Sequence, residues 1–176
     1  MELISYNGWP NCLRLSNALV DLVVTTDIGP RIIRYGFLDE ENEFAEVPEE
    51  QGKRGGDEWR SYGGHRLWHA PEDSVRTYVP DNQAVKYEDH GEFVRLVQQV
   101  EPLTGIQKEI DIRLSTVNTH ARLTHRLRNT NLWEVRLAVW ALTVMAPGGT
   151  AILPLPPRGT HPENLRPINS LTFWPY

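Results

Sequence analysis

The stretch Gln107-Lys108-Glu109-Ile110-Asp111-Ile112-Arg113-Leu114-Ser115 decides the fold class of this chain. Its aliphatic residues occupy positions 110, 112 and 114, and charged residues occupy positions 109, 111 and 113. An extended chain places alternate side chains on opposite faces, so this pattern predicts a β-strand with one buried and one solvated face. After a turn, Thr119–Arg128 repeats the pattern with His125 on its apolar face, which predicts an antiparallel partner strand.

Short strands continue upstream of this pair. Cys12–Leu15 and Val20–Val24 alternate on either side of a turn and predict a hairpin. Further strands are predicted at Arg31–Leu38, Glu43–Val47, Ala84–Glu88 and Glu92–Val100. The acidic, glycine-rich segment Pro48–Arg60 predicts a solvated loop, with a mobile flap as the alternative.

The C-terminal part carries the most apolar segments. Val135–Met145 is apolar on both faces, which predicts a central strand covered on both sides. Leu171–Trp174 resembles the start of another strand, and the sequence stops just after it. We therefore expect a domain that is incomplete at its C-terminus, with an exposed sheet edge near Phe173 and Trp174 through which the chain could form a homodimer.

Composition narrows the class of protein. No window shows a sustained helical periodicity, and the 13 glycines and 13 prolines among 176 residues indicate many turns. We predict a single all-β domain over residues 1–176, an antiparallel β-sandwich.

Charge and targeting signals exclude several partners. A net charge of −5 argues against nucleic acid, which requires a basic surface. The longest apolar run, Leu137–Ala146, is too short to span a bilayer. The single cysteine, Cys12, cannot form an internal disulfide, and the N-terminus has no signal-peptide pattern. These features predict a cytoplasmic protein that binds neither nucleic acid nor membranes.

The stretch Ser61–Asp73 concentrates the groups that could bind a ligand. It holds two glycines, two histidines, an arginine, a tryptophan and two carboxylates. A sugar ring has an apolar face and a rim of hydroxyls, so an indole beside fixed polar groups suits it. The residues expected to line such a site are His65, Arg66, Trp68 and His69.

A metal site in this stretch is the alternative that the spacing raises. His65, His69 and Glu72 would share one face of a helix, but Gly63-Gly64 and Pro71 disfavour a helix there. On a strand, residues four apart lie about 13 Å from each other, too far for one metal ion. We therefore expect no metal and no cofactor.

Several motifs together resemble a known family. They are Gly29-Pro30-Arg31-Ile32, Gly63-Gly64-His65-Arg66-Leu67-Trp68, Pro80-Asp81-Asn82 and Leu137–Thr143. In this order they resemble the galactose mutarotase-like superfamily, and most closely its branch called DUF4380. The resemblance implies a β-supersandwich that binds sugar on a concave sheet face, of which this chain would form roughly the N-terminal two-thirds.

The resemblance also implies site residues. Aldose 1-epimerases use a histidine to protonate the ring oxygen and a glutamate as base. Arg31 or Arg34 and His65 match the arginine and histidine that contact sugar in that family. The position of the catalytic histidine falls on Trp140, which cannot transfer protons, and the catalytic glutamate lies in the C-terminal part that this chain is expected to lack.

Three functions stay open from the sequence. The first is a carbohydrate-binding protein with the residues named above, in which Trp140 is either core or the floor of the site. The second is an epimerase-like enzyme with His65 or His125 as acid and Glu72 as base. The third is a structural or oligomerising sandwich without a sugar site.

Overall fold

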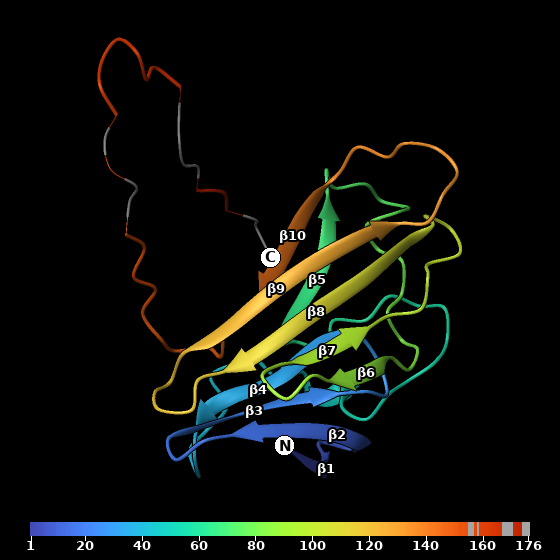
Figure 1. Cartoon of the computed structure of the whole chain (residues 1–176), viewed down its shortest axis with the longest axis vertical. Coiled ribbons are helices and arrows are strands. Elements are labelled where there is room, and N and C mark those ends of the chain that lie inside the picture. Colours follow the sequence, from blue (N-terminus) through green and yellow to red (C-terminus); the bar gives the residue numbers. More distant parts are fainter. Residues whose placement is uncertain (155–156, 158, 167–170, 174–176) are drawn as a thin grey trace.

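The computed structural model describes residues 1–154, 157, 159–166 and 171–173 (Figure 1). Two antiparallel sheets make up the described part, in agreement with the predicted all-β sandwich. The regular helical structure there is one turn of 3-10 helix, Pro48–Glu50. None of the described segments forms a helix long and apolar enough to cross a membrane.

The first sheet has six strands in the order β1-β2-β3-β4-β5-β10. Their bounds are β1 Glu2–Tyr6, β2 Trp9–Ser16, β3 Val20–Thr25, β4 Arg31–Phe37, β5 His65–Ala70 and β10 Ala138–Thr143. The predicted hairpin is confirmed as β2 and β3, with Leu13 opposite Val24. Arg31 of β4 lies opposite Arg66 of β5, and Trp68 of β5 lies opposite Trp140 of β10.

The second sheet has four strands in the order β6-β7-β8-β9. Their bounds are β6 Lys86–Asp89, β7 Val94–Val97, β8 Ile106–Leu114 and β9 Ala121–Asn129. The predicted pairing of β8 with β9 is confirmed over its full length, from Ile106 opposite Asn129 to Leu114 opposite Ala121. Figure 1 shows β8 and β9 crossing over β5 and β10 of the first sheet.

The main core lies between the two sheets. Its buried members are Leu13, Leu15, Leu22, Val24, Ile32, Leu67, Val94, Leu96, Ile110 and Ile112. Each such side chain contributes about 1.5–3 kcal/mol through its removal from water. A second apolar cluster covers the opposite face of the six-stranded sheet, where the indole of Trp9 donates a hydrogen bond to the Lys53 carbonyl and packs against Tyr62.

The structure corrects two burial predictions. Val135–Met145 is not a central strand: β10 is the edge of its sheet, where no described strand pairs with its outer side. Its faces are not both covered either, since Val139 is 49% exposed. The charged face of β8 is not solvated, since Glu109 and Asp111 are buried. Arginines cover them, with Arg128 bound to Glu109 and two arginines bound to Asp111.

Two local predictions also need revision, and one strand was not predicted. The stretch Glu43–Val47 forms only isolated bridges, at Phe44 and Glu46, and not a strand. Residues 171–173 lie outside any strand, while Trp174 lies outside the described residues. The homodimer expected at that edge stays a prediction. The strand β5, which was not predicted, turns out to organise the candidate site.

Candidate functional site

Strand β5 lies between β4 and β10 and is buried on both faces. Leu67 belongs to the core between the sheets, so His65, Leu67 and His69 form the inner face of β5. Arg66 and Trp68 form its outer face. The strand starts after Gly64, whose φ is 67°, and a Cβ there would lie 2.1 Å from the Ile32 carbonyl oxygen. Glycine therefore lets the chain enter β5 close against β4.

Two guanidinium groups share one carboxylate on the outer face. Arg31 donates to Asp81 at 2.7 Å and to the Gly63 carbonyl at 2.9 Å, while Arg66 lies 3.5 Å from the same Asp81 oxygen. Burial alone would raise the pKa of Asp81, but Arg31, Arg66 and Lys108 outweigh burial and lower it below its ordinary value. Burial, helped by repulsion from Arg31, lowers the pKa of Arg66 to about 9.

Aromatic rings pack around Trp68, and two of the rings in this group lie against the Arg66 guanidinium. Trp68 contacts three rings, with centroid distances of 6.2 Å to Trp59, 5.1 Å to Tyr78 and 5.3 Å to Trp140. The Arg66 guanidinium carbon lies 4.5 Å from the Trp68 ring centroid and 5.3 Å from that of Trp59, in the range of cation–π contacts. We call the set Arg31, Trp59, Arg66, Trp68, Tyr78, Asp81 and Trp140 the arginine–aromatic cluster.

Several polar atoms in this cluster lack hydrogen-bond partners. They are Nε of Arg31, Nε and Nη2 of Arg66, Nε1 of Trp68 and Oδ1 of Asp81, and all five are buried. Most buried polar atoms in proteins are hydrogen-bonded, so an unpaired one requires a physical explanation. Four unpaired donors and one unpaired acceptor, beside partly exposed aromatic rings, match the complementary groups of a polar ligand.

The inner face carries a different constellation. The Nε2 atoms of His65 and His125 lie 2.8 Å apart, and the Nδ1 atom of His65 lies 2.8 Å from the Thr143 hydroxyl. Burial, helped by His125 and Arg31, lowers the pKa of His65 to about 4, and burial lowers the pKa of His125 as well. The pair is therefore neutral at pH 7, with one ring donating to the other.

A third group of charges lies further along the inner face. Lys108 lies 2.5 Å from Glu101, and the Nε2 atom of His69 lies 3.9 Å from that carboxylate. All three side chains are buried. Burial would raise the pKa of Glu101, but His69, Lys108 and Thr104 together lower it below its ordinary value. The carboxylate is therefore ionised and holds the lysine charge inside the protein.

The structure brings some of the predicted site residues together and separates others. Arg31, Arg66, Trp68 and Trp140 meet in the arginine–aromatic cluster. His65, His69 and His125 lie on the inner face of the sheet. Arg34 binds Asp21 at 2.9 Å, away from both groups. Glu72 is exposed and accepts a hydrogen bond from Tyr78, at the opposite end of β5 from His65.

Sequence reasoning missed three members of the cluster. Asp81 had a signal, because Pro80-Asp81-Asn82 is one of the motifs that carry the family resemblance. Trp59 belongs to the segment predicted as a solvated loop, and Tyr78 to an irregular segment. Only the folded loops bring these two rings onto Trp68, which is why spacing along the chain did not reveal them.

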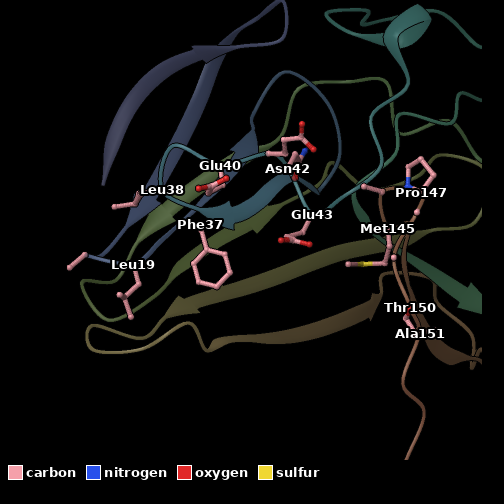
Figure 2. A pocket seen from close by; sticks show the side chains of 15 residues that line it. Leu19, Phe37, Leu38, Glu40, Asn42, Glu43, Met145, Pro147, Thr150 and Ala151 are labelled. Carbon is pink, nitrogen blue, oxygen red and sulfur yellow. The ribbon is translucent and has the colours of Figure 1, made fainter.

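An open cleft of about 1280 Å³ lies elsewhere, between the turn after β4 and the segment after β10 (Figure 2). Figure 2 shows Phe37 on one side of it and Met145 on the other. The cleft shares no residue with the arginine–aromatic cluster, and its glutamates, Glu40, Glu41 and Glu43, are exposed. We therefore base the function on the cluster, where buried polar atoms lack partners.

Comparison with known proteins gives no relative: no family model matches the chain, and neither does any curated protein or solved structure. The mutarotase-like resemblance therefore remains a hypothesis.

Proposed function

We propose that this chain is a carbohydrate-binding protein and that the arginine–aromatic cluster is its sugar site. The observation that carries the proposal is a buried guanidinium against two tryptophan rings, next to unpaired donors and an unpaired acceptor. Rings suit the apolar face of a sugar, and the unpaired atoms suit its hydroxyls. A site on this sheet face agrees with the mutarotase-like resemblance for Arg31 but not for His65, which lies on the inner face.

Ligand entry involves the segment that carries Trp59. This ring is 39% exposed and lies over Arg66, whereas Trp68 beneath it is only 7% exposed. A sugar that stacks on Trp68 has to displace Trp59, while one that stacks on Trp140 meets a half-buried ring directly. The proposal thus gives the loop before β5 the role of a flap.

Binding is better supported than conversion. Epimerisation requires an acid and a base on either side of the sugar. No described carboxylate lies within 4.0 Å of His65 or His125, and Glu72 is separated from His65 by the length of β5, about 16 Å by strand rise. The pair His65 and Glu72 is therefore a poor acid and base for one sugar, and we propose no catalytic step.

A structural role is the second candidate, because one specific observation favours it. The rings around Trp68 close over it, as expected for a packed motif that binds nothing. That function does not explain why Arg66 and Trp68 carry unpaired donors, since a purely structural cluster gains by pairing them.

The deciding experiment is a titration with monosaccharides and short oligosaccharides, followed by tryptophan fluorescence. We expect a saturable change that Trp68→Ala abolishes. Trp68→Phe keeps an aromatic ring and guards against a folding defect in the alanine variant, and Trp133→Phe is the matched control because Trp133 is exposed outside the cluster. A flat response of the wild-type chain across the panel would favour the structural role.

The remaining parts of the proposal concern partners and compartment. We propose a small-molecule carbohydrate as the partner, with no nucleic acid or membrane, because the chain is acidic. A cytoplasmic location agrees with Cys12, which is free and buried in the second apolar cluster.

A further inference from the structure

The arginine–aromatic cluster contains more positive than negative charge. Arg31 and Arg66 are two cations at pH 7, and Asp81 is the only described carboxylate within 4.0 Å of either guanidinium. The charge of nearby Lys108 does not add to this excess, because Glu101 neutralises it at a distance of 2.5 Å. One positive charge therefore remains uncompensated in a buried place, which is costly unless an anion joins it.

The uncompensated charge belongs to Arg66. Arg31 is bound directly to Asp81 at 2.7 Å, whereas Arg66 lies 3.5 Å from that oxygen and makes no hydrogen bond with its Nε or its nearer terminal nitrogen. Its side chain is 6% exposed. A guanidinium whose Nε and one terminal nitrogen make no hydrogen bond presents the two-pronged donor that binds a carboxylate or phosphate side-on.

The neighbouring groups show which anion would fit. The rings of Trp59 and Trp68 flank the guanidinium, so the anion is attached to a body with apolar surface. Oδ1 of Asp81 is an unpaired acceptor, which requires a donor such as a hydroxyl on the same ligand. A simple inorganic anion has no apolar body, although inorganic phosphate does carry a hydroxyl.

We propose that the ligand is an anionic sugar, with a carboxylate or phosphate bound by Arg66, a hydroxyl donated to Asp81 and the ring packed on the tryptophans. This inference rests on the proposed carbohydrate-binding function and narrows its substrate class. The carboxylate and the phosphate forms share the same recognition chemistry, and the experiment separates them.

The test is isothermal titration calorimetry of the whole chain with glucuronate, glucose 6-phosphate, glucose, acetate and inorganic phosphate. We expect at least one charged sugar to bind about tenfold or more tightly than glucose, the effect of one charge-assisted hydrogen bond. Which of the two binds identifies the anionic group. Arg66→Gln should reduce that affinity to the level of glucose, and the matched control Arg122→Gln, an exposed arginine on β9, should not.

The salt dependence of binding by the wild-type chain is a second readout, which does not depend on whether a variant folds. Binding of the charged sugar should weaken as NaCl is raised, while binding of glucose should not. Equal affinities for charged and neutral sugars would overturn this inference and leave the carbohydrate proposal standing. Acetate or phosphate binding as tightly as the sugars would show a general anion site and overturn it too. If nothing binds, both proposals fail.

Discussion

The two faces of β5 accommodate buried ionisable side chains in opposite ways. His65 and Arg66 are consecutive residues, both buried, and each carries a group that can be charged. On the inner face the cost of a buried charge is avoided, because His65 is neutral and hydrogen-bonded to His125. On the outer face the charge is kept, because arginine cannot readily give up its proton, and Asp81 compensates part of it.

This difference decides which face can respond to a ligand and which to pH. A neutral, mutually bonded pair has no need of an external partner. Two guanidiniums that share one carboxylate keep one net positive charge, which attracts an anion. The comparison leads to three predictions, in order of decreasing effect.

The largest effect is expected from Asp81→Ala. This variant leaves Arg31 and Arg66 buried without their shared carboxylate, and breaking such a pair costs about 3–5 kcal/mol of unfolding free energy. Urea denaturation measures the loss. Asp57→Ala is the control, because Asp57 is exposed and its removal should change stability by no more than about 0.5 kcal/mol. Equal stability of the two variants would show that Asp81 does not compensate the outer face.

The second prediction concerns acid and the inner face. The folded pKa of His65, about 4, lies below its ordinary value of 6.5. Between these values the unfolded chain binds a proton that the folded chain refuses, so stability falls as the pH drops through this window and is unaffected above it. The full loss is at most about 3 kcal/mol, from 1.36 kcal/mol for each pH unit.

Urea midpoints measured between pH 7 and pH 5 avoid the pH range in which most carboxylates titrate. His65→Asn should reduce the slope in this range, since asparagine stays neutral, and the part that remains is assigned to His125, whose pKa burial also lowers. His90→Asn should leave the slope in place, because His90 lies exposed in the turn between β6 and β7. A slope that persists unchanged in His65→Asn would assign the acid sensitivity to other groups.

The sheet framework could be predicted from the sequence because alternation reports burial directly. The alternation predicted that Ile110 and Ile112 share a buried face, and the structure places both in the core. The prediction failed for β5 because both faces of His65–Ala70 are buried and both carry polar residues. Such a strand shows no alternation of apolar and polar residues from which it could be recognised. It also failed for Glu109 and Asp111, whose burial depends on arginines of neighbouring strands.

The site was predicted in composition but not in arrangement. The stretch Ser61–Asp73 contained the right residue types, yet strand alternation divides His65 and His69 from Arg66 and Trp68. The pairing of Trp68 with Trp140 is a register that local sequence does not encode, and the arrival of Trp59 depends on how a loop folds. Asp81, which balances two arginines, is fifteen residues from Arg66 and fifty from Arg31.

The smallest effect is expected from Glu72→Gln, which tests the outer face at its rim. Glu72 is exposed and accepts a hydrogen bond from Tyr78, a ring of the cluster, and glutamine can still accept that bond. The substitution removes only a negative charge beside a site proposed to bind anions. We expect affinity for the charged sugar to rise about twofold to threefold at low salt, since an exposed charge contributes less than about 1 kcal/mol. The gain should vanish at high salt, where exposed charges are screened.

Glu49→Gln, an exposed glutamate in the 3-10 turn, is the control with the same change in net charge. A weaker affinity in Glu72→Gln would mean that this carboxylate itself contacts the sugar, and the outer face would then bind hydroxyls at its rim as well as the anion at Arg66.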